Sequence, residues 1–234
     1  MRPVVVLVHG GFWRAHRTLD LMRPLAASLR HAGFAVWNLE YRAVGHDGGG
    51  WPGTLCDVAA GVDAVADLAD VHPMDLDRVA LVGHSAGGQL VLWAAGDRAL
   101  PDVAVPAARV RPALVVSLAG VCDLDAADVA DLGDSAVRGF LGGGPDAVPH
   151  RYRSASPAAL VPLGVPQVLI HGDADRKVPI AQSQRYARAA VDAGDRVALV
   201  ELPGEDHMAL VDPDSAAWRA TETRLVRTLR PDGG

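Results

Sequence analysis

The sequence predicts an α/β fold in which helices cover both faces of a mostly parallel sheet. Short apolar runs alternate along the chain with longer segments whose apolar residues recur every three or four positions. The runs are rich in Val, Leu and Ile without polar alternation, as is typical of strands buried on both faces. With 234 residues, of which 50% are hydrophobic, the chain is large enough to form this core within a single domain over residues 1–234.

Six strands and five main helices are expected from this alternation. The expected strands are Val4–Val8, Ala35–Leu39, Val79–Val82, Leu114–Leu118, Gln167–Ile170 and Ala198–Leu202. The expected helices are Leu19–His31, Thr54–Leu68, Ala86–Ala95, Ile180–Asp192 and Ser215–Leu229. Gly33 suits the end of the first helix, and Pro52 precedes the start of the second.

Residues 121–165 do not fit the alternation. They contain Gly142–Gly144 and the prolines Pro145, Pro149 and Pro157, with two short helices expected over 126–132 and 135–141. Glycine and proline interrupt regular structure. We therefore expect an insertion after the fourth strand that forms a small lid over the strand ends.

Composition argues against several classes of partner. The net charge of −6 without a basic stripe disfavours nucleic acid and anionic membranes. The apolar run Val4–Val8 is too short to span a membrane and lacks the layout of a signal peptide. Cys56 and Cys122 do not make a disulfide framework, which favours two reduced thiols in a cytoplasmic protein.

A serine is placed for nucleophilic chemistry. Gly83-His84-Ser85-Ala86-Gly87 follows an apolar run and precedes a helix that begins with small residues, which is the context that a G-x-S-x-G motif requires. The glycines permit a sharp turn that leaves no room for side chains. The turn is predicted to present the Ser85 oxygen at the positive end of the following helix.

A second turn, His9-Gly10-Gly11-Phe12-Trp13, follows the first expected strand. A turn so poor in side chains exposes backbone N–H groups, which a tetrahedral oxyanion requires. The alternative is a tight structural turn in which His9 satisfies its own hydrogen bonds.

Together these segments resemble α/β-hydrolases. The second turn is similar to the HGGG-type oxyanion loop of esterases and to the HGGYW-like turn of serine-type kynurenine formamidases (arylformamidases). The resemblance implies that the N–H groups of Gly11, Phe12 and Ala86 form an oxyanion hole. Tyr41-Arg42, Trp51-Pro52 and Asp57 are similar to the YR…P…D stretch of the hormone-sensitive-lipase and arylformamidase groups. The chain begins at what the family counts as its third strand, so a small sheet without an N-terminal cap is expected.

The resemblance extends to an acid and a base. His171-Gly172-Asp173-Ala174-Asp175-Arg176-Lys177-Val178-Pro179 resembles the HGxxDxxVP segment of this fold, and matching by position selects Asp175 as the acid. Asp173 is the rival, although a bond to its own loop is the commoner role for such a residue, and Asp123 is a more distant candidate. His207 follows the last expected strand, where it can reach Ser85 as a general base. The order Ser, Asp, His is that of this fold.

The resemblance implies a serine hydrolase of small-acyl esters or amides, of carboxylesterase or arylformamidase type, without metal or cofactor. Trp13, Trp51 and His84 are expected to line the substrate pocket, with packing under loops as the alternative for both tryptophans. Phe12 and Trp13 are expected to crowd the acyl side, which favours short acyl groups.

Other functions are less compatible with the sequence. A peptidase or thioesterase of the same fold remains an alternative, as does a non-catalytic binding homologue, although Ser85, Asp175 and His207 are all present. Metal-dependent hydrolysis lacks a histidine pair at ligand spacing. A Rossmann nucleotide-binding domain requires G-x-G-x-x-G after its first strand, which His9–Trp13 does not supply.

Overall fold

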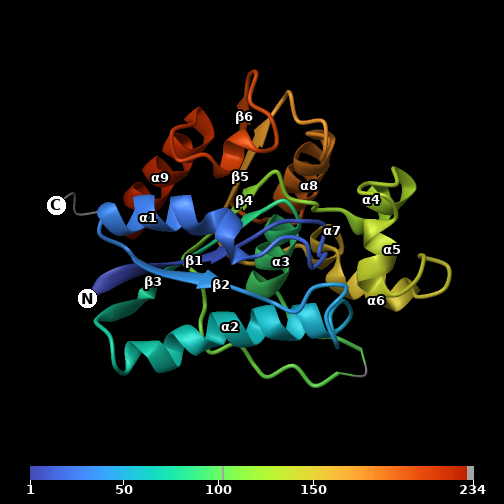
Figure 1. The fold of residues 1–234 in the computed structure, drawn as a ribbon, viewed down its shortest axis with the longest axis horizontal. Helices are drawn as coiled ribbons and strands as arrows, with labels where there is room; N and C mark the ends of the chain where they lie inside the picture. The colour runs from blue at the N-terminus through green and yellow to red at the C-terminus, as the bar shows by residue number, and fades with distance from the viewer. Residues whose placement is uncertain (102, 231–234) are drawn as a thin grey trace.

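A six-stranded parallel sheet forms the centre of the computed structural model, which describes residues 1–101 and 103–230 (Figure 1). The order across the sheet is β2-β1-β3-β4-β5-β6. The strands are β1 (Arg2–Val8), β2 (Ala35–Leu39), β3 (Met74–His84), β4 (Leu114–Leu118), β5 (Gln167–Gly172) and β6 (Val197–Leu202). The expected α/β architecture is confirmed. β3 begins five residues earlier than expected, because Met74 and Asp75 pair with Arg2 and Pro3 before a shift in register.

Helices cover the two faces of the sheet in separate layers (Figure 1). One face carries α1 (Arg23–His31) and α9 (Ala216–Leu229), and the other carries α2 (Gly53–Ala69), α3 (Ala86–Ala95) and α8 (Ala181–Asp192). The side chains of β1 alternate between the two cores, which explains its unbroken run of valines and leucine.

The first expected helix is divided in two. It begins as a 3₁₀ turn, η1 (Leu19–Met22), and continues as α1. The side chain of Thr18 accepts a hydrogen bond from the backbone of Asp20, which caps the 3₁₀ turn. Pro24 stands in the first turn of α1, where its missing N–H is not needed.

The insertion over residues 121–165 contains four helices, not the two that were expected. They are α4 (Leu124–Val129), α5 (Ala136–Leu141), α6 (Pro149–Ala155) and α7 (Pro157–Leu160). The expectation was wrong because Pro149 and Pro157 begin helices here and do not break them. Phe140 and Tyr152 bury the insertion against the core on the α2–α3 side, and in Figure 1 α4, α5 and α6 lie together at one end of the molecule.

Parallel pairing brings the carboxyl ends of the strands to one edge of the sheet. The loops that follow β1, β3, β5 and β6 therefore meet there.

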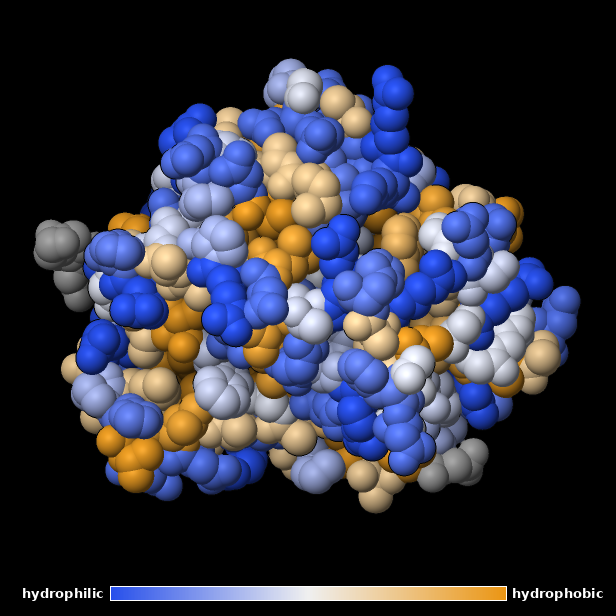
Figure 2. Space-filling view, in the orientation of Figure 1, coloured by the Kyte–Doolittle hydropathy of each residue, from blue (hydrophilic) through white to orange (hydrophobic). Residues whose placement is uncertain are grey.

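On the face seen in Figure 2, hydrophobic residues occur in small separate groups among hydrophilic ones. Within residues 1–101 and 103–230, no helix combines the length and the apolar character needed to cross a bilayer.

Gly87, in α3 at the carboxyl edge of the sheet, and Gly139, in α5, offer a matched test of packing. A Cβ on Gly87 would lie 2.1 Å from the carbonyl oxygen of Val8, whereas one on Gly139 would meet no atom within 4 Å. Gly87→Ala should therefore lower the free energy of unfolding by about 3 kcal/mol or more. Gly139→Ala should raise it by about 0.5 kcal/mol, because alanine favours the helix. Urea unfolding of both variants measures this, and similar effects would contradict the packing described.

Candidate active site

Ser85 lies at the sharp turn between β3 and α3. Its backbone has φ 56° and ψ −119°, a conformation that L-residues rarely adopt. The turn is compact because a Cβ on Gly83 would lie only 2.0 Å from the carbonyl oxygen of Gly87. The N–H of Ser85 donates to Leu118 O at 2.8 Å, which ties the turn to the end of β4. Ser85 is therefore held at the first turn of α3, where the helix dipole favours negative charge.

Asp175 and His207 come from different loops and form a close pair. Nδ1 of His207 donates to Oδ2 of Asp175 at 2.6 Å. Oδ1 of the same carboxylate accepts from the N–H groups of Lys177 and Val178, at 2.8 and 2.9 Å. The Asp175 side chain has no exposed surface, and His207 is 6% exposed. The loops after β5 and β6 are thus fixed to each other through one buried carboxylate.

A second histidine also faces Asp175. His171 Nδ1 accepts from Ser183 Oγ at 2.8 Å, so its hydrogen is on Nε2, which lies 2.9 Å from Val178 O and 3.3 Å from Asp175 Oδ2. Burial alone raises the pKa of Asp175, but the hydrogen bonds from His171 and His207 outweigh it and hold the pKa below the usual range. Asp175 is therefore a carboxylate at neutral pH. Because Nδ1 of His207 is bonded to it, Nε2 of His207 carries the free lone pair.

One pocket of about 70 Å³ contains both Ser85 and His207. The residues that line it are Gly11, Phe12, His16, Arg17, Leu21, His84, Ser85, Lys177, His207 and Met208. The structure thus brings Ser85, the Asp175–His207 pair and the turn after β1 together at the carboxyl edge of the sheet.

The three residues expected to donate to an oxyanion all lie near Ser85. Gly11 and Phe12 line the pocket, and Ala86 is the first residue of α3, where helix geometry leaves N–H groups without an acceptor. In the part of the chain that the structure describes, no protein acceptor is bonded to the N–H of Gly11, Phe12 or Ala86. The arrangement can therefore stabilise an anion that forms next to Ser85.

His84 lines the pocket but is only 2% exposed. Its Nε2 donates to the carbonyl oxygen of His207 at 3.0 Å, and the two rings lie 4.5 Å apart between centroids. Burial and the neighbouring His207 lower the pKa of His84 to about 3. His84 is thus a neutral residue that holds the His207 backbone. Its burial disfavours the contact with substrate that was expected of it.

Trp13 does not line the pocket, so this expectation was wrong. The side chain is fully buried, stacks on Phe140 with centroids 4.7 Å apart, and donates from Nε1 to Gln89 Oε1 at 2.9 Å. Gln89 in turn donates to Ala155 O at 2.9 Å. Burial of a large indole with its N–H satisfied is more favourable than exposure at a pocket wall. Trp13 therefore anchors the oxyanion turn to α3 and to the insertion.

Trp51 also lies outside the Ser85 pocket, which corrects its expected role. Its ring is half-buried beneath the Arg151 guanidinium, which lies 5.6 Å from the ring centroid. The backbone N–H of Trp51 donates to Phe140 O at 2.7 Å. Both tryptophans therefore fit the alternative expectation of packing under loops, because Phe140 and Arg151 of the insertion contact them.

Sequence reasoning missed several residues of the site. Oε1 of Glu40 accepts from Nε2 of His9, the first residue of the oxyanion turn, at 2.7 Å. Arg17 and Lys177 lie on the pocket wall. Neither shows a periodic pattern, although Lys177 is the only lysine of the chain and stands within the segment that carries Asp175.

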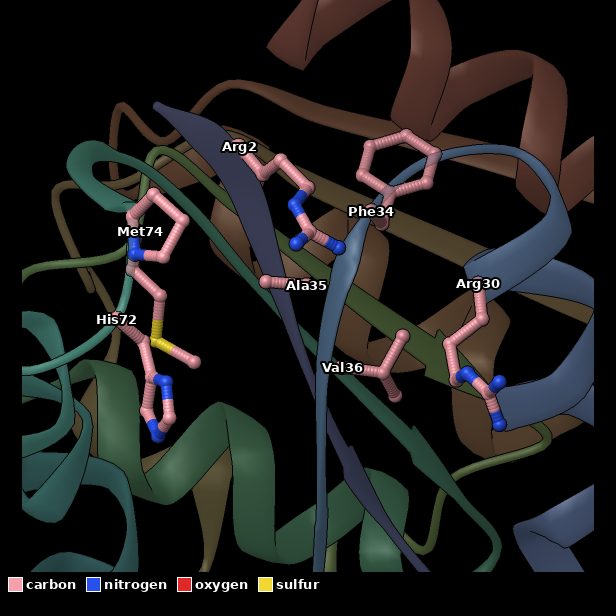
Figure 3. A pocket seen from close by; sticks show the side chains of 8 residues that line it. Arg2, Arg30, Phe34, Ala35, Val36, His72 and Met74 are labelled. Carbon is pink, nitrogen blue, oxygen red and sulfur yellow. The ribbon is translucent and has the colours of Figure 1, made fainter.

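A larger cavity of about 250 Å³ lies elsewhere (Figure 3). Arg2, Ala35 and Met74, which line it, are the first residues of β1, β2 and β3. Because the strands are parallel, this cavity is at the edge of the sheet opposite Ser85. It belongs to a different surface from the candidate active site.

Comparisons with known proteins identify a family and several related chains. A family model described as BD-FAE matches residues 1–189. Esterase LipC of Mycobacterium tuberculosis is 27% identical over 217 residues, which is 88% of this chain and 52% of LipC. The acylamino-acid-releasing enzyme of Mus musculus is 29% identical over 231 residues, which is 94% of this chain and 30% of that enzyme. The chain spans about half of the first relative and less than a third of the second.

Solved structures show the same architecture. Esterase B from Lactobacillus rhamnosis superimposes with a TM-score of 0.83 at 22% identity, covering 99% of this chain and 76% of that one. At this level of identity the likeness concerns the fold. The expected α/β-hydrolase fold is confirmed.

The burial of His84 beside His207 predicts a specific dependence of stability on pH. His84 has a pKa of about 3 in the folded protein, against about 6.5 for an unfolded histidine. Between these values the unfolded chain binds more protons, so the free energy of unfolding decreases as the pH falls below about 6.5. From pH 7.5 to pH 5 the wild type should lose about 2 kcal/mol more than His84→Gln, which cannot titrate. Denaturant unfolding at both pH values measures this, and equal losses would contradict a buried neutral His84.

Proposed function

We propose that this chain, which belongs to the BD-FAE family, is a serine hydrolase that cleaves small-acyl esters or amides through an acyl-enzyme. The observation that carries the proposal is His207, held by Asp175 at 2.6 Å and lining the same pocket as Ser85. A base fixed by a buried carboxylate beside a serine at a helix N-terminus is the arrangement that activates a hydroxyl group. Relatives named as esterases and acylamino-acid-releasing enzymes support the class of reaction.

The proposed reaction begins with attack of Ser85 Oγ on the substrate carbonyl. Nε2 of His207 takes the hydroxyl proton, and Asp175 stabilises the resulting imidazolium. The N–H groups of Gly11, Phe12 and Ala86 stabilise the tetrahedral oxyanion. The imidazolium then protonates the leaving alcohol or amine, and water, activated by the same imidazole, releases the acid from Ser85.

The size of the pocket supports a short acyl group. The space beside Ser85 is about 70 Å³, and Phe12, Leu21 and Met208 form its apolar walls. Phe12 alone takes the crowding role that was expected of Phe12 and Trp13. Its ring also packs closely on Gly133 of the insertion. A Cβ on Gly133 would lie only 2.7 Å from the ring. We infer that residues 121–165 close this side of the pocket, as a lid would.

A cytoplasmic location is part of the proposal. Cys56 and Cys122 are both free, and Cys122 is fully buried. Burial raises the pKa of the Cys122 thiol to about 12, so that it stays protonated and unreactive. Reduced thiols are compatible with a reducing compartment.

Hydrolysis of 4-nitrophenyl esters from acetyl to decanoyl tests the function. We expect kcat/KM to be highest for acyl chains of about two to four carbons, because each methylene that fits adds only about 0.8 kcal/mol and one that clashes loses more. Ser85→Ala should keep its circular dichroism spectrum and lose activity by about 10⁴-fold or more. A preference for octanoyl or longer chains would refute the small-acyl proposal, and a Ser85→Ala variant that retained more than a few per cent of activity would refute the nucleophile.

A further inference from the structure

The wall of the Ser85 pocket is cationic although the chain as a whole is acidic. Lys and Arg total 22 against 28 Asp and Glu. Arg17 and Lys177 nevertheless line the pocket, together with His16. Within the described chain no aspartate or glutamate contributes to this wall. The positive character is therefore a local feature of the site.

Arg17 is attached directly to the oxyanion turn. A Cβ built on Gly11 would lie 2.6 Å from Cβ and 2.7 Å from Cγ of Arg17. The stem of Arg17 thus occupies the space that Gly11 leaves empty, with Gly11 at φ 122°. Arg17 is an exposed residue, so its charge is available at the mouth of the pocket.

Lys177 is fixed through its backbone. Its backbone N–H donates to Oδ1 of Asp175, the carboxylate that holds His207. Lys177 lines the pocket together with His84. Its ammonium charge also lowers the pKa of His84, after burial and His207. A chain that otherwise uses only arginine as its basic residue has its single lysine here.

Within the described residues, neither of the two cations is neutralised by an ion pair with the protein's own carboxylates. Six arginines form ion pairs with carboxylates: Arg23, Arg42, Arg78, Arg98, Arg109 and Arg138. Among residues 1–101 and 103–230, neither Arg17 nor Lys177 has a carboxylate within 4.0 Å. Two unpaired cations beside a pocket attract an anion to it.

We propose that the substrate carries a carboxylate, which Arg17 and Lys177 bind at the mouth of the Ser85 pocket. The inference rests on the proposed hydrolase function and adds the class of substrate. The arginine fork suits bidentate binding of a carboxylate, and the lysine adds a second, compact charge. The apolar space beside Ser85 remains for a short acyl group.

Two matched pairs of esters test the proposal and locate the carboxylate. Monoethyl succinate and ethyl succinamate differ by a charge on the acyl side, whereas 4-acetoxybenzoate and 4-acetoxybenzamide differ by a charge on the leaving group. The measured quantity is the ratio of kcat/KM for the charged ester to that for the neutral one, each divided by the rate of spontaneous hydrolysis. We expect a ratio of about 20 in one of the two pairs, which decreases as ionic strength rises.

Substitutions assign the preference to individual residues. Arg17→Gln and Lys177→Gln should each lower the ratio about fivefold, as expected for one exposed charge pair, and the double variant should bring it close to one. Arg176→Gln is the matched control, because Arg176 is exposed and adjacent to Lys177 but does not line the pocket. Its ratio should stay within about 1.5-fold of the wild type, since long-range fields are screened.

The outcomes separate this inference from the function on which it rests. Hydrolysis of the neutral esters with a ratio near one in both pairs would overturn the carboxylate and leave the hydrolase in place. A ratio that fell equally in Arg176→Gln would also overturn it, because a diffuse field would then be the cause. If none of the four esters were cleaved, the proposed function would fail, and the inference with it.

Discussion

The buried carboxylate of Asp175 is the group on which the geometry around Ser85 depends. A buried charge must have all its hydrogen-bonding positions filled, since an unsatisfied one costs several kcal/mol. Here two backbone N–H groups occupy Oδ1 and two histidines face Oδ2. This requirement fixes the tautomer of His207, the fold of its own loop, and the distance between the loops after β5 and β6.

Strained backbone in the oxyanion turn and at Ser85 is held in place by packing. Phe12, Trp13 and Ser85 all have positive φ, at a cost of about 1–3 kcal/mol each. The burial of Trp13, its stacking on Phe140 and its hydrogen bond to Gln89 offset that cost. The oxyanion turn is therefore held in place by α3 and by the insertion, so residues 121–165 support the site through Phe140.

The strands and the loops of the site were predictable for physical reasons. Strands buried on both faces must be continuously apolar, and the turns at Ser85 and Gly11 demand residues without bulky side chains. Matching to the HGxxDxxVP segment favoured Asp175 over Asp173 as the acid. In the structure Asp175 bonds His207, whereas Asp173 accepts from the N–H of Gly204 at 2.7 Å, as a loop-stabilising residue does.

What the sequence did not predict depends on long-range contacts. An aromatic residue after a glycine turn can face a pocket or the core, and only Phe140 and Gln89, distant in sequence, determine that Trp13 is buried. Prolines both break and begin helices, which hid α6 and α7. The cations of the pocket wall lie in loops without periodicity and become neighbours only when the strand ends meet.

The rate at which a fluorophosphonate probe modifies Ser85, followed by intact-protein mass, tests the coupling of Asp175, His207 and Ser85 most directly. The wild type should form one adduct, located on Ser85. Asp175→Asn should slow its formation by about 10³-fold or more, because an amide does not hold His207 with Nε2 free. Asp173→Asn, which loses only a bond within its loop, should stay within about threefold of the wild-type rate. Equal labelling rates in the wild type and Asp175→Asn would contradict the role of the buried carboxylate.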